Sequence, residues 1–276
     1  TLIGFGMTKK VVFADNIATF VNSIFSDPTK YGSLIIILAT IGFGVQIYCD
    51  FSAYTDIAVG SAKILGFHFK KNFNKPYFAR NPSDFWKRWH ISLSSWLKDY
   101  LYIPLGGNRK GKARMYVNLM ITMVLGGLWH GASLNFVIWG GFQGLLLLVH
   151  RFFSNLFKFR LPTIISVIIT QYFVFLGWLI FRVENSDHLI YSIKKFVMLD
   201  FANPQKILQT ISIHFQPIIF IVLFWCIHYF IYKKGDLIYF ISSLNLKYWF
   251  FCVSFVILLI LIFAPSETIE FIYFKF

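Results

Sequence analysis

Six long, uncharged apolar segments constrain this chain more than any other feature of its sequence. They cover residues 34–48, 116–128, 134–149, 164–181, 217–232 and 248–263. A helix needs about 20 such residues to cross the hydrocarbon core of a bilayer, and the shorter segments could be tilted, kinked or re-entrant. The sequence therefore predicts an all-α, polytopic membrane helix bundle with re-entrant and interfacial amphipathic helices. We expect one integral-membrane domain over residues 1–276.

The composition excludes most soluble folds. Hydrophobic residues make up 57% of the chain, only 14% are charged, and the mean hydropathy is +0.63. A soluble domain has about 25% charged residues, so buried helices of a large soluble protein are the weaker alternative. The first residues, Thr1-Leu-Ile-Gly-Phe-Gly-Met7, show neither a signal-peptide pattern nor an initiator methionine, and we expect the chain to be the C-terminal, catalytic portion of a longer protein. The three scattered cysteines predict neither a metal site nor a disulfide framework.

The net charge of +14 is concentrated in one stretch. Eleven basic residues lie between Gly66 and Tyr116, opposed only by Asp84 and Asp99. Such a stretch could bind nucleic acid in a soluble protein, but in a membrane protein the positive-inside rule places it on the cytoplasmic side. We therefore expect no nucleic-acid partner. The stretch could also attract anionic lipid headgroups or the phosphates of an acyl donor.

A predicted hairpin over residues 116–149 carries the first candidate functional residue, His130. Each arm reaches about 22–27 Å, short of a hydrocarbon core of about 30 Å, so the turn should lie inside the membrane. Glycines on both arms permit close helix approach and leave room for a substrate. An ionisable residue at this depth is a functional candidate. On position alone, His130 could equally brace the turn through a backbone carbonyl.

The second candidate, His90, falls in a predicted amphipathic helix over residues 81–96. Asn81 before a proline, with Asp84 three residues later, is typical of a helix start. On a continuous helix the tryptophans share one face, as in a helix lying at the membrane interface. His90 shares that buried face, where histidines are more often structural than catalytic.

Five motifs follow one another within about eighty residues. They are Cys49-Asp-Phe-Ser-Ala-Tyr-Thr-Asp-Ile-Ala58, Asn72-Phe-Asn, Phe85-Trp-Lys-Arg-Trp-His-Ile-Ser-Leu-Ser-Ser-Trp96, Asp99-Tyr-Leu-Tyr-Ile-Pro-Leu-Gly-Gly-Asn-Arg109 and Trp129-His-Gly131. Together they resemble the membrane-bound O-acyltransferase family, and the resemblance extends over the whole chain. The Ile-Pro-Leu-Gly-Gly-Asn-Arg string and Phe175-Leu-Gly-Trp-Leu-Ile-Phe-Arg182 look like its alginate and peptidoglycan O-acetyltransferase branch rather than its teichoic acid D-alanyltransferase branch.

The resemblance implies transfer of an acetyl group from a cytoplasmic thioester, acetyl-CoA, to hydroxyls of an extracytoplasmic envelope polysaccharide. It implies a multi-pass protein of the bacterial inner membrane that works with an extracytoplasmic acetyltransferase. His130 matches the histidine of the family's Trp-His-Gly motif and would be the base; His90 matches its Arg-Trp-His histidine. The C-terminal tail is similar to an aromatic motif of D-alanylation systems, by which Tyr273 could relay the acetyl group. An aromatic anchor at the interface is the alternative for Tyr273. No cofactor or metal is expected.

Other functions and roles stay open from the sequence. A transporter or channel would also have polar residues and glycine-broken helices within the membrane, and a structural scaffold for envelope enzymes needs no chemistry at all. Asp50, Asp56 or Asp99 could orient a histidine. More often such aspartates pair with a nearby lysine or arginine.

Overall fold

A computed structural model describes residues 1–156, 161–200, 203–235, 237–265 and 270–272. Their regular secondary structure is helical, with no strand among the described residues, which confirms the all-α prediction. Five helices are long and apolar enough to span a membrane: α3 (Ser33–Ile64), α7 (Leu134–Leu156), α8 (Thr163–Arg182), α11 (Phe215–Lys234) and α13 (Leu246–Phe263). The predicted span at 116–128 forms α6 (Gly111–Leu128), which is not among the five.

The chain divides into two compact units. The first comprises residues 1–70 and 191–276, and the second comprises residues 71–190. The prediction that residues 1–276 form one functional domain stays a prediction. Each unit is described by itself.

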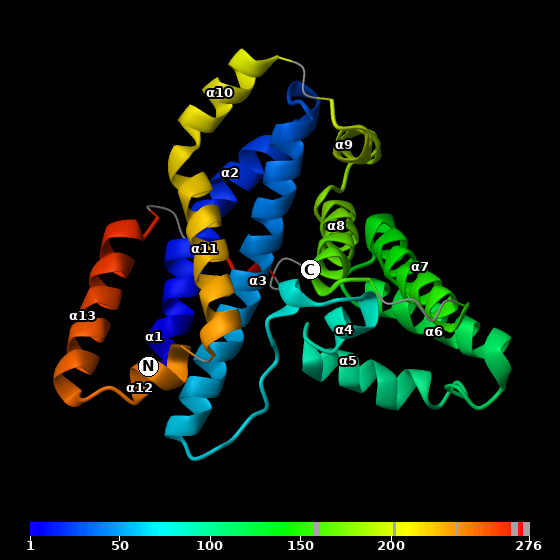
Figure 1. The fold of residues 1–276 in the computed structure, drawn as a ribbon, viewed down its shortest axis with the longest axis horizontal. Coiled ribbons are helices and arrows are strands. Elements are labelled where there is room, and N and C mark those ends of the chain that lie inside the picture. The colour runs from blue at the N-terminus through cyan, green and yellow to red at the C-terminus, as the bar shows by residue number, and fades with distance from the viewer. Residues whose placement is uncertain (157–160, 201–202, 236, 266–269, 273–276) are drawn as a thin grey trace. The chain divides into compact units, whose positions relative to one another are not determined.

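The first unit is built around α3, whose 32 residues correspond to about 48 Å of helix. A second helical stretch lies against it, formed by α1 (Leu2–Met7), the π-helical segment η1 (Thr8–Ala14) and α2 (Asp15–Ser26). Helices α11 and α13 pack on this pair, α11 against α2 and α13 against η1 (Figure 1). The core of this unit therefore lies along α2 and α3, where Ile17, Phe20 and Ile36 are completely buried.

The remaining helices of the first unit are shorter. They are η2 (Pro28–Lys30), α9 (Ser186–Met198), whose first residues belong to the second unit, α10 (Pro204–Ile213) and α12 (Leu237–Ser242). Along α13 the apolar side chains face outward, Leu261 being 71% exposed. A lipid-facing helix is expected to expose apolar side chains in this way.

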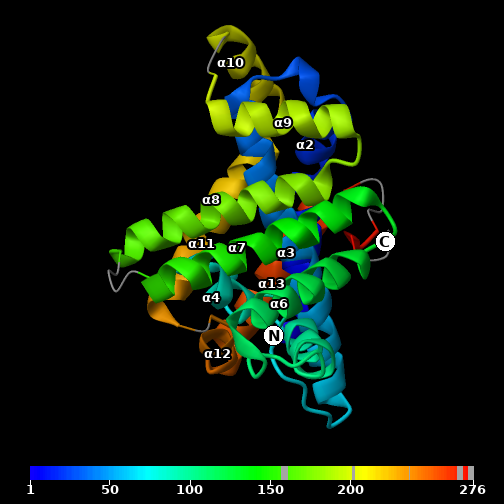
Figure 2. The same cartoon turned by 90° about the vertical axis from the view of Figure 1, so that its right-hand side faces the viewer.

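The second unit consists of three side-by-side helices and a set of short ones. Helix α7 packs between α6 and α8 (Figure 2). The short elements are η3 (Pro76–Phe78), α4 (Pro82–Trp86), α5 (Ile91–Leu97) and the π-helical segment η4 (Lys98–Tyr102). Both predicted site histidines belong to this unit.

The close contact of α6 and α7 depends on glycine, as the sequence predicted. A Cβ atom at Gly127 would lie 2.3 Å from the carbonyl oxygen of Phe136, and one at Gly140 would lie 2.5 Å from that of Met123. Real Cβ atoms do not approach a backbone oxygen this closely, so both positions require glycine. At Gly141, by contrast, a Cβ atom would meet no other atom within 4 Å.

Candidate active site

The predicted amphipathic helix over residues 81–96 is wrong as one helix. The chain forms α4, turns at residues 87–90, and begins again as α5 at Ile91. Asn81 starts α4 as predicted, because its side-chain oxygen accepts the backbone N–H of Asp84 at 2.8 Å. The break places His90 in the left-handed region, with φ 43° and ψ 56°. His90 is buried, as expected, but Trp96 is 54% exposed.

The Asn72-Phe-Asn motif holds this strained turn in place. The carbonyl of Asn72 accepts the N–H of Ile91 at 2.9 Å, and its side-chain oxygen accepts both the N–H and the hydroxyl of Ser92 at 3.0 Å. Asn74 donates its N–H to the carbonyl of Arg88 at 2.9 Å. A non-glycine residue in the left-handed region costs about 1–3 kcal/mol and persists where its surroundings enforce it. Such strain concentrates at functional sites.

His130 lies in the turn between α6 and α7, outside the five candidate spans. Its backbone N–H donates to the carbonyl of Gly127 at 2.9 Å, which closes the last turn of α6. Gly131 follows with φ 155° and leaves no room for a Cβ, because the Phe136 ring lies 2.7 Å from that position. The two glycines therefore fix where the histidine lies.

Four aromatic rings surround the imidazole of His130. The centroid distances from its ring are 5.1 Å to Trp129, 5.2 Å to Trp139, 5.3 Å to Phe181 and 6.3 Å to Phe136. The His130 side chain is only 6% exposed. The imidazole is therefore enclosed by aromatic side chains, and the site draws residues from the ends of α6, α7 and α8.

A chain of aromatic contacts joins this site to the segment that carries His90. Trp139 stacks on Trp178 at 6.2 Å, and Trp178 lies 4.7 Å from Trp89, the residue before His90. The rings of His90 and His130 also contact the same residue, Trp129, at 6.2 and 5.1 Å. The Arg-Trp-His motif, the Trp-His-Gly motif and the string at residues 175–182 are thus packed into one cluster, although they are separated in the sequence.

Burial sets the protonation of both histidines. It lowers the pKa of His130 to about 4. Burial also lowers the pKa of His90 to about 3, and the nearby His130 contributes to that shift. Both imidazoles are therefore neutral at pH 7. A neutral imidazole in an apolar site can accept a proton from a hydroxyl group, which is what a general base does.

The three aspartates differ from one another in their surroundings. Asp50 lies 2.7 Å from the amine of Lys10, and Asp56 lies 2.6 Å from that of Lys9. These two follow the pairing alternative, whereas Asp99 is exposed in η4 and its role as an orienting group stays a prediction. Tyr273 lies outside the described residues. Within the ranges that the structure describes, no cluster of His, Cys, Asp and Glu could hold a metal ion.

Sequence reasoning missed the aromatic walls of the site. Trp139 and Phe136 carry no motif of their own, and Phe181 belongs only to a family string. Their spacing after Trp129-His-Gly131 gave one usable signal. Phe136 and Trp139 lie two and five residues beyond the start of α7 at Leu134, within about one and a half helical turns, so both rings stay near the turn that carries His130.

Comparison with known proteins agrees with the family that these motifs resemble. Residues 5–187 match the model of the membrane-bound O-acyltransferase family. The chain is 35% identical over 295 residues to a peptidoglycan O-acetyltransferase of Helicobacter pylori, covering 100% of this chain and 56% of that protein. It is 43% identical over 182 residues to a probable alginate O-acetylase, AlgI, of Pseudomonas aeruginosa, covering 65% and 34%.

A more distant relative represents the other branch. A teichoic acid D-alanyltransferase of Bacillus subtilis is 34% identical over 161 residues, which cover 53% of this chain and 41% of that protein. The chain spans from about a third to just over half the length of these relatives.

Proposed function

Because the chain belongs to the membrane-bound O-acyltransferase family, we propose that it is the catalytic portion of an O-acetyltransferase that modifies an envelope polysaccharide. The match over residues 5–187 carries this assignment, and the five apolar helices fit a multi-pass membrane protein. Relatives named for peptidoglycan and alginate support an acetyl group as cargo and a polysaccharide as acceptor. The bacterial inner membrane is the proposed location.

His130 acts as the base in this proposal. It takes the proton of the acceptor hydroxyl, whose oxygen attacks the thioester carbonyl. The carbon–sulfur bond then breaks, CoA leaves as the thiolate, and the proton held by His130 is available to neutralise it. The pKa of about 4 keeps His130 neutral before the reaction. His90 binds the acyl group or passes the proton on.

Two buried indole groups are suited to the acyl carbonyl. The N–H groups of Trp139 and Trp178 have no acceptor among the described residues. A buried donor gains free energy when it meets an oxygen, and a donor aimed at a developing oxyanion lowers the barrier of acyl transfer. Trp139, which contacts His130 directly, is the better placed of the two.

The substrates approach from opposite sides of the membrane in this account. The basic stretch between Gly66 and Tyr116 lies in the cytoplasm and draws the phosphates of acetyl-CoA, the donor substrate. The polysaccharide lies outside, where an extracytoplasmic acetyltransferase completes delivery. Tyr273 receives the acetyl group as a phenyl ester and passes it to that partner.

A thioester assay separates an enzyme from a pore or a scaffold. Full-length protein in detergent is incubated with acetyl-CoA, and free CoA is measured with a thiol reagent. An acyltransferase releases CoA, because water replaces the missing acceptor, and His130→Gln should release at least about a hundredfold less. Absence of CoA release from the wild-type protein would favour a transporter or a scaffold.

A further inference from the structure

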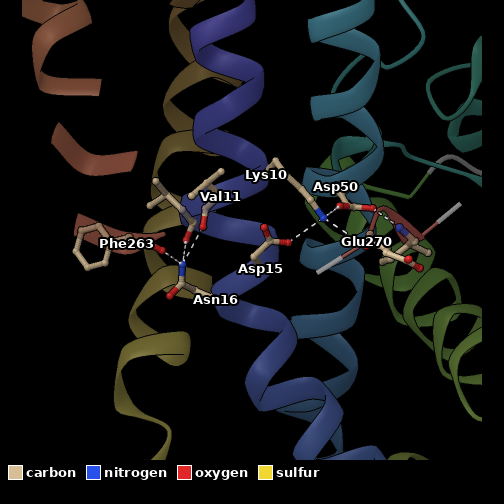
Figure 3. A network of polar contacts seen from close by, with 9 residues as sticks. Lys10, Val11, Asp15, Asn16, Asp50, Phe263 and Glu270 are labelled. Atoms are coloured by element: carbon tan, nitrogen blue, oxygen red, sulfur yellow. Dashed lines mark hydrogen bonds and ion pairs between the residues drawn. The ribbon is translucent and has the colours of Figure 1, made fainter. Parts of the chain in front are cut away.

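A cluster of charges is buried in the first unit, away from the two histidines in the sequence. The amine of Lys10 in η1 lies 2.7 Å from Oδ1 of Asp50 in α3 and 2.8 Å from Oδ1 of Asp15 in α2 (Figure 3). Lys10 is 7% exposed, Asp15 5% and Asp50 2%. Buried charges are expensive to desolvate, so a cluster that is kept needs further polar partners.

The C-terminal segment supplies these partners. The backbone N–H of Ile272 donates to the second oxygen of Asp50 at 2.6 Å, and the amine of Lys10 donates to the carbonyl of Glu270 at 3.4 Å (Figure 3). Between them, the ring of Phe271 lies 4.5 Å from the Lys10 amine. That ring also contacts Tyr54, one helical turn beyond Asp50, at 5.7 Å. Residues 270–272 are therefore held by α3 on one side and by Lys10 of η1 on the other.

We propose that Asp50, braced by Lys10, is a positioning residue that clamps residues 270–272 onto α3 and so fixes the start of the C-terminal tail. Lys10 and Asp15 already form a charge-balanced pair. The two oxygens of Asp50 have different partners: Oδ1 contacts the amine of Lys10, and Oδ2 accepts the backbone N–H of Ile272. Holding two helices together would not need this oxygen.

A neighbouring ion pair supports this reading and offers a matched control. Lys9 and Asp56 join the same two elements, η1 and α3, at 2.6 Å, and Lys9 also donates to the hydroxyl of Ser52 at 2.7 Å. The polar and ring contacts of Lys9 and Asp56 are made with η1, α1 and α3 rather than with residues 270–272. Lys9–Asp56 thus joins η1 to α3, whereas Lys10–Asp50 joins the same two elements and also binds residues 270–272.

The clamp bears on acyl transfer through the next residue. Tyr273 follows Ile272 directly in the chain, so whatever fixes Ile272 restricts where the tyrosine can reach. This consequence rests on the proposed function, because it requires Tyr273 to be the acceptor of the acetyl group. Clamping itself does not depend on that function and can be measured separately.

Thiol accessibility tests the clamp. Ile272→Cys is introduced after replacing the native cysteines with alanine, which leaves the backbone N–H of residue 272 in place. Modification by a water-soluble maleimide in detergent should be slow, because Ile272 is 9% exposed. Asp50→Ala should accelerate it at least about tenfold, since a hydrogen bond to a charged group is lost.

Phe271→Ala should accelerate the modification too, and it removes none of the charged groups of the cluster, so it remains informative if Asp50→Ala fails to fold. The control, Lys9→Met with Asp56→Leu, should leave the rate within about twofold of the parent. Equal rates in the parent and both test variants would overturn the clamp. So would an equal acceleration in the control.

The effect of the clamp on acyl transfer is measured as the ratio of acetyl groups delivered to CoA released. Acetyl groups delivered to the acceptor per CoA released should fall about tenfold in Asp50→Ala and remain unchanged in the control. An unchanged ratio in a variant with a released segment would overturn the positioning role. If wild-type protein released no CoA, the proposed function would fail while the thiol result would still decide the clamp.

Discussion

Replacing Gly140 by alanine should separate α6 from α7 and disturb the site at their turn. A Cβ at this position would lie 2.5 Å from the Met123 oxygen, whereas ordinary contacts are 3.4–4 Å. The helices would have to part by about 0.9 Å, and forcing extra atoms into a packed contact costs about 1–3 kcal/mol. Gly141→Ala is the matched control, because nothing lies within 4 Å of its Cβ position. It should be stabilising by up to about 1 kcal/mol, from helix propensity alone.

Thermal unfolding in detergent measures the difference. Gly140→Ala should unfold at least about 2 °C below Gly141→Ala, because helix propensity favours both alanines equally and the packing cost of about 1–3 kcal/mol remains as the difference. Activity should respond as well, because the same Cβ lies 3.2 Å from the Cα of Gly127, three residues before His130. Misplacing a catalytic group by about 1 Å can cost about a hundredfold in rate. Equal midpoints and equal CoA release in the two variants would refute the packing argument.

Three further predictions follow from the site and the topology. Burial lowers the pKa of His130 to about 4, so CoA release should be constant from about pH 8 to about pH 5 and fall below that as the imidazole takes up a proton; a midpoint near pH 6.5 would contradict it. Tyr273→Phe should abolish polysaccharide acetylation if Tyr273 relays the acetyl group, whereas an aromatic anchor would tolerate the change. Cysteines at Lys71 and Lys110 should resist an impermeant reagent added outside intact cells, and labelling at either one would reverse the proposed topology.

Continuous apolar runs and their lengths predicted the long helices correctly. The six apolar segments all form helices, because a continuous apolar run has few alternatives once its backbone must be hydrogen-bonded internally. The predicted ends of these helices were less accurate, since α3 continues to Ile64 through a stretch that includes Asp50 and Asp56. The predicted apolar segment stopped at residue 48, before these two aspartates, whose lysine partners lie on η1, 40 and 47 residues earlier in the chain.

Local patterns could not predict the break at His90. Its sequence has good amphipathic periodicity, and the left-handed backbone is enforced by hydrogen bonds that the N–H groups of Ile91 and Ser92 donate to Asn72. Such contacts between distant residues override local preference. The family resemblance did identify Asn72-Phe-Asn as a motif, but the reason for it lies in this tertiary contact.

The contacts between Lys10, Asp50 and residues 270–272 also could not be predicted from local sequence patterns. Lys9 and Lys10 stand alone in an apolar stretch, and an ionisable pair in such a place is a functional signal. Nothing in the spacing, however, indicates that Asp50 and residues 270–272 complete the cluster. The His130 site was accessible because its histidine, glycines and tryptophan are adjacent in sequence.

Polysaccharide acetylation in cells tests the central claim, that His130 is the base of an O-acetyltransferase. Cells lacking the native protein are complemented with full-length wild-type protein, His130→Gln or His150→Gln, and ester-linked acetyl is released by mild base and quantified. Because a positioned base contributes about 10²–10⁴-fold, His130→Gln should leave less than about a hundredth of the acetyl groups at equal membrane abundance. His150→Gln, at the far end of α7 from this turn, should match wild type. More than about a tenth of wild-type acetylation in His130→Gln would contradict the account.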